Sequence, residues 1–146
     1  MSPVTNNTLF DVEAIRQLKA RYFRSMDMKD WDGLAACFTE DLEADFREGP
    51  GMLAYGRDNY MEQISVILAD ATTIHHGHMP EIIILDEKSA RGIWAMDDIV
   101  ILPGLQLQGW GHYHELYRKE NNAWRIAKIR LTRLRLLQNG EAQSFL

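Results

Sequence analysis

The chain has 146 residues, of which 46% are hydrophobic, and a formal net charge of −5, so one domain with a real core is expected. The acidic balance argues against a nucleic-acid partner. The basic residues of 125–135 do not indicate one either, because they alternate with apolar residues as in a strand with a charged face. The lone Cys37, in an apolar run, excludes an intrachain disulfide and predicts inert packing, and the lack of a leader-like or membrane-spanning apolar stretch predicts a cytoplasmic protein without membrane contact.

The first half of the chain predicts helices around one short strand. Residues 1–8 are expected to form a flexible N-terminal arm, followed by a single α+β domain over residues 9–146. A helix is predicted over about 9–28, with a capping signal at Thr8 and Asp11. Its apolar residues recur at three- and four-residue steps, which marks one buried face: Ile15, Leu18, Tyr22 and Met26. The other elements expected here are a helix over 31–38, a strand over 42–47, a turn over 48–51, and a helix over 57–69 with Tyr60, Ile64, Ile67 and Leu68 inward.

The second half is rich in strand-forming residues. Four such runs are separated by short breakers: 72–85, 90–102, 105–119 and 123–137. Breakers this short indicate hairpins, so the sheet should be largely antiparallel. Helices followed by a meander are typical of an α+β domain. Strands of up to about 15 residues must curl, so we expect a cone-shaped curved sheet, closed by the N-terminal helices, with an interior pocket.

Three residues suggest proton-transfer chemistry. His75 could act as a base, Asp27 as the carboxylate that orients it, and Tyr22 as a hydroxyl donor. Each also has a structural interpretation: His75 and Tyr22 could be hydrogen-bonded core residues, and Asp27 a solvated or capping carboxylate. An offset of five residues places Tyr22 and Asp27 about 140° apart around the helix, so both reach one pocket only if the helix crosses its mouth or ends there.

Further histidines follow His75 on the same strand. His76 and His78 are expected on the face opposite His75. Because alternation divides the three histidines between two faces and no cysteine lies nearby, no metal site is predicted.

Candidate substrate-binding residues lie on the later strands. Arg133 falls on an apolar strand face, where it could hold a carboxylate, carbonyl or thioester, or pair with an acid such as Asp98. Trp94, Met96 and Asp98 share a strand face, which suggests an apolar pocket wall that admits one acid. Trp110 and His112 are further candidates for lining the pocket, although their face of the strand could instead be exposed or form an interface.

Residues 12–32, together with the segment from His75 to Ile82, resemble SnoaL-like proteins of the nuclear transport factor 2-like superfamily. Within it the chain is most similar to bile acid 7α-dehydratases and, more distantly, to scytalone dehydratases and hexachlorocyclohexane dehydrochlorinases. The resemblance implies a cone-shaped α+β fold, catalytic positions at Tyr22, Asp27 and His75, and a pocket arginine at Arg133. The chain departs from the dehydratases around residues 103–111, a region that shapes substrate choice.

The residues and the resemblance together lead to a functional hypothesis. It is a cofactor-independent dehydratase acting on a hydrophobic cyclic, polyketide-like or steroid-like carbonyl compound. An isomerase or cyclase using the same base, and a non-catalytic ligand-binding or assembly module, remain alternatives. The sequence shows no nucleotide loop, haem motif or metal set, so no cofactor is expected. The resemblance further implies a homo-oligomer, dimer or trimer, that assembles through the outer face of the sheet.

Overall fold

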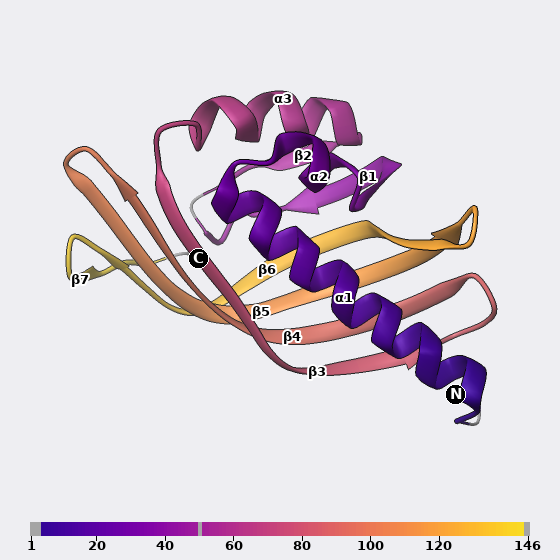
Figure 1. The fold of residues 1–146 in the computed structure, drawn as a ribbon. Coiled ribbons are helices and arrows are strands. Elements are labelled where there is room, and N and C mark those ends of the chain that lie inside the picture. Colours follow the sequence, from indigo (N-terminus) through magenta and orange to yellow (C-terminus); the bar gives the residue numbers. More distant parts are fainter. Residues whose placement is uncertain (1–3, 50, 145–146) are drawn as a thin grey trace.

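The computed structural model describes residues 4–49 and 51–144, and within them three helices pack against a strongly curved sheet (Figure 1). The helices are α1 (Asn6–Met28), α2 (Trp31–Ala35) and α3 (Arg57–Ile67). The strands are β1 (Phe38–Asp45), β2 (Leu53–Tyr55), β3 (Thr72–Ile84), β4 (Ser89–Leu102), β5 (Leu105–Glu120), β6 (Ala123–Gln138) and β7 (Glu141–Ala142). The predicted α+β class is therefore confirmed.

The sheet has the strand order β2-β1-β6-β5-β4-β3, and β7 pairs with β6. The β3–β4, β4–β5 and β5–β6 pairs are antiparallel hairpins, whereas β1 lies parallel to β6, which makes the sheet mixed. Figure 1 shows α1 running along the concave side of this sheet, with α3 and the β1–β2 hairpin above it. This arrangement confirms the predicted cone-shaped curved sheet with the N-terminal helices over its concave side, and it leaves β3 as an edge strand beside α1.

The first helix begins earlier than predicted. Thr5 is its N-cap: the Thr8 backbone N–H donates to the Thr5 hydroxyl (3.2 Å), and the Thr5 backbone N–H donates to the Thr8 hydroxyl (2.7 Å). This reciprocal capping box replaces the expected signal at Thr8 and Asp11. Residues 6–8 therefore belong to α1 and not to a flexible arm, of which residues 1–3 lie outside the described part of the chain.

The predicted apolar stripe of α1 is confirmed, since its four members are at most 2% exposed: Ile15, Leu18, Tyr22 and Met26. A buried ion pair also joins this helix to the sheet. The Lys19 ammonium lies 2.8 Å from the Glu115 carboxylate on β5, and both side chains are fully buried. The hydroxyl of Tyr117 donates to the same carboxylate (2.7 Å) and accepts the indole N–H of Trp94 (2.9 Å). A chain of polar contacts thus fixes α1 across the sheet.

Other boundaries differ from the prediction in detail. The second helix ends at Ala35 and β1 begins at Phe38, where residues 31–38 were expected to be helical and the strand to start at 42. The short strands β2 and β7 were not predicted. On α3, Tyr60 is buried as expected, but Ile67 is 53% exposed.

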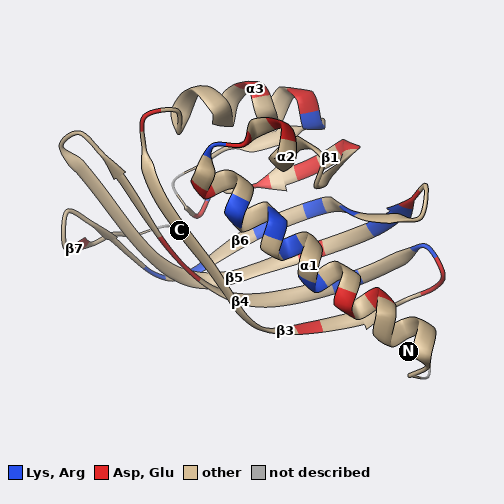
Figure 2. Ribbon diagram, in the orientation of Figure 1, with Lys and Arg blue, Asp and Glu red and all other residues tan. Residues whose placement is uncertain are grey.

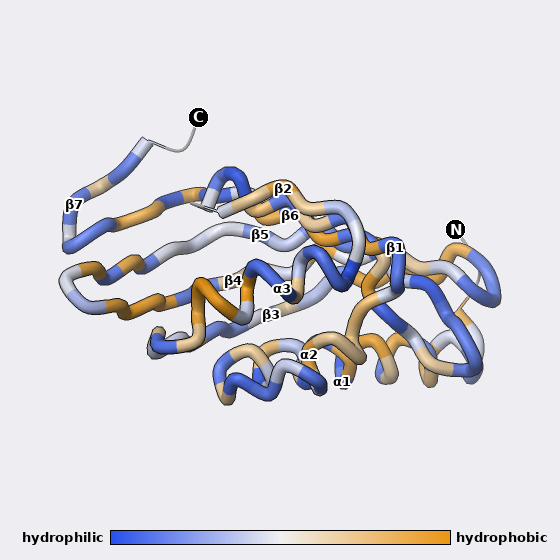
Figure 3. Tube along the Cα trace, turned by 90° about the horizontal axis from the view of Figure 1, so that it is seen from above, coloured by the Kyte–Doolittle hydropathy of each residue, from blue (hydrophilic) through white to orange (hydrophobic). Residues whose placement is uncertain are grey.

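Each long strand separates an inward from an outward set of side chains, and Figure 3 shows hydrophobic and hydrophilic residues interspersed along β3 to β6. On β4 the inward set includes Trp94, Met96 and Asp98, each less than 9% exposed. The partner residues on β5 in register with this set are Tyr113, Gly111 and Gly109 in turn. These two glycines leave room on the inward face for side chains that arrive from β6.

Charged residues of both signs are distributed over several elements, although α1 and β6 carry many of the basic ones (Figure 2). On β6, Lys128 pairs with Glu43 (3.2 Å) and Arg133 with Asp98 (2.7 Å).

Among the described residues, no helix combines the length and the apolar character needed to cross a membrane.

Candidate functional site

An apolar cavity of about 270 Å³ lies between the helices and the concave face of the sheet. Its described lining combines a mostly apolar wall with a few polar groups: Tyr22, Met26, Phe46, Gly49, Gly51, Met52, Tyr60, Ile64, Ile67, Leu68, His75, Asp98, Val100, Leu102, Leu105, Leu107, Tyr113, Leu131 and Arg133. Few polar groups in an apolar hollow are typical of small-molecule sites. A wider depression elsewhere is lined mainly by charged and polar residues and includes none of the predicted site residues.

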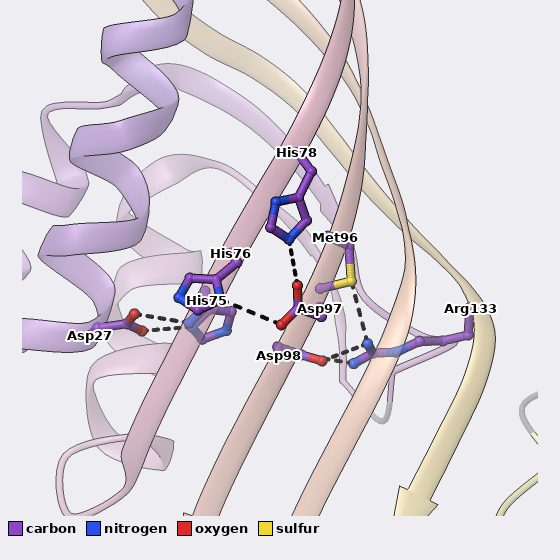
Figure 4. A network of polar contacts seen from close by, with 8 residues as sticks. All are labelled: Asp27, His75, His76, His78, Met96, Asp97, Asp98 and Arg133. Atoms are coloured by element: carbon purple, nitrogen blue, oxygen red, sulfur yellow. Dashed lines mark hydrogen bonds and ion pairs between the residues drawn. The ribbon is translucent and has the colours of Figure 1, made fainter.

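The structure brings Asp27 and His75 into direct contact at the wall of this cavity (Figure 4). The Asp27 Oδ1 atom lies 2.7 Å from Nδ1 of the His75 ring, and Oδ2 accepts the His75 backbone N–H at 2.9 Å. An ionised carboxylate only accepts, so Nδ1 carries the proton and Nε2 is the basic nitrogen. The His75 ring, 9% exposed, lines the cavity, whereas Asp27 stands behind it.

Two further residues hold Asp27 in place. The Thr73 hydroxyl donates to Asp27 Oδ1 (3.0 Å), and the Lys29 ammonium donates to the Thr73 hydroxyl (2.8 Å). Burial by itself would raise the pKa of the Asp27 carboxyl, but hydrogen bonds from His75 and Thr73 outweigh burial and hold that pKa below its usual value. Asp27 is therefore a carboxylate near neutral pH, able to orient an imidazole and to stabilise an imidazolium.

Lys29 also explains how Asp27 reaches the sheet. The residue has φ 59° and ends α1 in a left-handed cap, so the helix stops beside the edge strand β3. There the Asp27 carboxylate takes up the His75 backbone N–H on the free edge of β3. The 140° offset from Tyr22 is thereby accommodated, because Tyr22 lines the cavity itself while Asp27 acts through the His75 ring.

Tyr22 contributes a protonated phenol to the cavity. Its ring is 1% exposed and meets the rings of Phe23, Phe38 and Tyr113 edge-on, with centroids 5.3–6.1 Å apart. Burial, and then the neighbouring Tyr113, raise the pKa of Tyr22 well above 10.0. The hydroxyl therefore keeps its proton and can donate a hydrogen bond to a ligand oxygen.

The second polar feature of the cavity is a buried ion pair. The Arg133 guanidinium donates to both Asp98 oxygens (2.7 and 3.1 Å), to the Gly49 carbonyl (3.0 Å) and to the Met96 sulfur (3.6 Å). Among the described buried side-chain nitrogen and oxygen atoms, only Nε of Arg133 has no hydrogen-bond partner. A Cβ at Gly109 would collide with this guanidinium, so a side chain there would displace the Arg133–Asp98 pair. Of the alternatives open for Arg133, the structure thus shows pairing with Asp98.

Two predicted cavity residues lie on the correct face but at the wrong end of β4. Trp94 is a core residue whose indole N–H donates a hydrogen bond to the Tyr117 hydroxyl, and Met96 packs against Arg133. Neither belongs to the described lining of the cavity. The reason is α1, whose aromatic side chains fill the space above this part of the sheet; the Phe23 ring even lies where a Cβ on Gly77 would go.

The other two predicted cavity residues are on the outer face. Trp110 pairs in register with Asp97, and His112 with Ala95, and both of these β4 residues alternate with the inward set Trp94, Met96 and Asp98. The prediction for Trp110 and His112 is therefore wrong. The inward positions of this part of β5 are taken by Gly109 and Gly111, because the Arg133 guanidinium and the β6 backbone occupy that space.

Sequence reasoning also missed part of the wall. The cavity extends past Asp98 toward the β4–β5 hairpin, where alternate residues line it: Val100, Leu102, Leu105 and Leu107. Their period-two spacing continues that of Asp98 and was the available signal. Thr73 and Lys29, which act behind Asp27, had no such signal.

Comparison with known proteins places the chain in a wider group. A family model of the SnoaL-like domain matches residues 7–130. The fold is similar to that of a candidate scytalone dehydratase from Novosphingobium aromaticivorans, with a TM-score of 0.81, 24% identity, and coverage of 92% of this chain and 91% of that one. It is also similar to a type 2 hexachlorocyclohexane dehydrochlorinase, with a TM-score of 0.78, 18% identity and 90% coverage of each chain. The fold is also similar to that of a nuclear transport factor 2-like protein from Novosphingobium aromaticivorans, with a TM-score of 0.73, 21% identity and 92% coverage of each chain.

At these identities the structures show a shared fold, whereas the family match spans most of the sequence. The chain belongs to the SnoaL-like domain family and has the nuclear transport factor 2-like fold.

Proposed function

We propose that this protein is a lyase that removes water from a hydrophobic, cyclic carbonyl compound of the polyketide or steroid type. The observation that carries the proposal is the 2.7 Å contact between Asp27 and His75, whose ring lines an apolar cavity. A base held in this way can take up a proton from carbon, because Asp27 stabilises the imidazolium that forms.

The proposed reaction is an elimination. Nε2 of His75 removes a proton from the carbon next to the carbonyl, and the electron pair forms a carbon–carbon double bond as the carbon–oxygen bond to the hydroxyl breaks. Asp27 stabilises the imidazolium, which returns its proton to the departing hydroxide so that water leaves. Tyr22 donates a hydrogen bond to the carbonyl oxygen as negative charge develops there.

The cavity also favours a class of substrate. Its wall is mostly apolar, and Arg133, the one Lys or Arg among its described lining residues, is already neutralised by Asp98 and hydrogen-bonded to the Gly49 carbonyl. An anionic substrate would meet no unpaired positive charge among the described lining residues. A neutral hydroxyketone is therefore favoured over a free carboxylate, with the Arg133 Nε–H as an additional donor.

The names of similar proteins agree with this reaction class. Two of the structures that share the fold are named as a candidate scytalone dehydratase and a hexachlorocyclohexane dehydrochlorinase, and both names denote an elimination. These likenesses support the lyase class and leave the substrate to experiment.

Proton removal can be tested before the natural substrate is known. A panel of neutral cyclic β-hydroxyketones and their deoxy analogues is incubated with the protein in D₂O, and deuterium uptake next to the carbonyl is followed by NMR. We expect His75→Ala to lower the rate by about 10²–10⁴-fold and Tyr22→Phe by about 10²–10³-fold. His112→Ala, on the outer face of the sheet, is the matched control and should retain the wild-type rate.

Water loss is then measured on the hydroxylated members of the panel, by mass spectrometry and by the absorbance of the conjugated product. Enone formation that depends on His75 supports the dehydratase. Deuterium uptake without water loss would assign an isomerase or cyclase that uses the same base. Equal rates for wild type and His75→Ala would leave a ligand-binding module as the better interpretation.

A further inference from the structure

Three side chains with metal-ligating atoms lie together on the outer face of the sheet, across β3 from the His75 ring. His76 and His78 are two residues apart on β3 and therefore share a face. Asp97 on β4 is in register with His76, which places its carboxylate on the same face. Figure 4 shows His78 and Asp97 directed toward each other, with His76 beside them.

The distances in this cluster suit one shared ion. The His78 Nε2 atom lies 2.7 Å from Asp97 Oδ1, and His76 Nδ1 lies 3.4 Å from Asp97 Oδ2. Each carboxylate oxygen thus faces a different imidazole, and one ligand atom from each residue falls within 4.8 Å of the other two. Ligands about 2.0–2.2 Å from a tetrahedral Zn²⁺ ion are about 3.3 Å apart, which is within the range of separations seen here.

We propose that His76, His78 and Asp97 form a binding site for Zn²⁺ on the outer face of the sheet. Two neutral imidazoles and one carboxylate are ligand types that zinc prefers, and three protein ligands leave a fourth position for water. Paired strands of the sheet hold the three backbone positions, so binding requires only small side-chain rotations. The exposed fractions of 59%, 55% and 37% for His76, His78 and Asp97 leave those rotations free and the ion accessible.

The site is separate from the cavity. His75 points to the other side of β3 and is committed to Asp27, so it provides no ligand. Zinc bound outside therefore takes no part in the proposed proton transfer, and its binding can be measured without any substrate.

The chain provides its own control. His112 and His114 on β5 are likewise two residues apart on the outer face, and their rings lie 6.3 Å apart, close to the 6.1 Å between His76 and His78. His114 is hydrogen-bonded to Thr132 instead (3.0 Å). Among the described residues, the one trio of ligand atoms that meets this spacing is the cluster at Asp97.

The test is isothermal titration of Zn²⁺ into metal-free protein from which any affinity tag has been removed. We expect one ion per chain for the wild type and for His112→Ala/His114→Ala. Because removing even a group that supports a ligand weakens metal binding by about 10–100-fold, His76→Ala/His78→Ala should weaken it by at least about tenfold. Asp97→Asn should weaken it too. Circular dichroism confirms that each variant is folded.

A second readout locates the ion. Trp110 is in register with Asp97 on the neighbouring strand, which places its ring beside the site. Cu²⁺, which binds imidazoles strongly, should quench its fluorescence in wild type but not in His76→Ala/His78→Ala, and Trp110→Phe should remove most of the quenched signal. The proposal is overturned if wild-type protein takes up no Zn²⁺, or if His76→Ala/His78→Ala binds as tightly as wild type.

Discussion

At the end of α1, the Asp27 carboxylate accepts hydrogen bonds from the ring and the backbone N–H of His75 and from the Thr73 hydroxyl. All three donors favour its charged form. The same contacts therefore position the candidate base and stabilise the fold, so that a change at Asp27 should affect both.

For Asp27→Asn we expect a lower free energy of unfolding at neutral pH, because the amide keeps the shape but loses the charge. The pKa of Asp27 is lowered in the folded state. Its stabilising contribution is thus fully present above the unfolded value of about 3.8–3.9 and is lost as the pH falls through the folded pKa. Urea unfolding from pH 7 to pH 3 should show the deficit shrinking at the acid end. The exposed Asp70→Asn is the control, and a deficit that does not change with pH would contradict this account.

Tyr22 has the opposite linkage. Burial raises the pKa of its phenol well above 10.0, so folding favours the protonated form. The stabilisation is complete below the unfolded value and is lost as the pH rises beyond it. We expect the ultraviolet phenolate titrations of wild type and Tyr22→Phe to coincide up to pH 10. An extra tyrosine ionising in the wild type below that pH would show that Tyr22 is accessible to water.

At the scale of elements, the ion pair between Lys19 on α1 and Glu115 on β5 connects the helix to the centre of the sheet. The Lys19 ammonium also lies 3.7 Å and 3.8 Å from the ring centroids of Tyr22 and Tyr113. The pair thus packs against the ring of the candidate donor Tyr22 and joins α1 to β5.

Removing one partner of this pair should be costly. Lys19→Met leaves a buried carboxylate without its cation, for which we expect a loss of about 3–5 kcal/mol in the free energy of unfolding. The surface pair Arg118–Asp41, whose side chains are 40% and 68% exposed, serves as the comparison, and Arg118→Leu should cost at most about 1 kcal/mol. Lys19→Met/Glu115→Met should recover part of the loss. Urea denaturation measures all three, and a double variant that is no more stable than Lys19→Met would contradict this account.

The periodic elements were predictable because each buries one regular face. The stripe Ile15, Leu18, Tyr22 and Met26 indicated α1, and short breakers indicated the hairpins. The start of α1 was missed because Asn6 and Asn7 carry no apolar signal and the capping box uses Thr8 where a Glu or Gln is usual. Strand β2 has three residues and exists only through its pairing with β1, which local sequence does not encode.

The site was predictable in part, for a different reason. The spacing of Asp27 and His75 and the family resemblance indicated the pair before the structure placed the two side chains together. On β5, however, alternation separates two faces without saying which is inward. Both faces carry aromatic residues, Trp110 on one and Tyr113 on the other, so aromatic content does not decide between them. The structure places Gly109 inward, because a side chain from a different strand, Arg133, needs the space.

For the whole molecule, the predicted homo-oligomer remains a prediction, and the outer face of the sheet offers a surface for it. Apolar residues on this face are 38–45% exposed: Ile74, Ile93, Ile101 and Leu116. We expect wild-type protein to be a dimer or trimer by size-exclusion chromatography with light scattering, and Ile93→Lys/Leu116→Lys to shift it toward monomer. Val66→Lys changes an equally apolar side chain, 75% exposed on α3, and should not. A monomeric wild type would exclude the assembly.

β3 carries His75 on its cavity side and His76 and His78 on its outer face, and this restricts how the length of the strand can change during evolution. Asp27 accepts hydrogen bonds from Thr73 and His75 near the start of the strand, and the pairing with β4 shifts its register between His78 and Glu81. Losing or gaining one residue between these points would turn His75 outward and bring a neighbour into the cavity, while also dispersing the outer histidines. Homologous chains that keep both faces should therefore differ here by substitution, or by two residues at a time, and single-residue gaps should collect beyond the register shift instead.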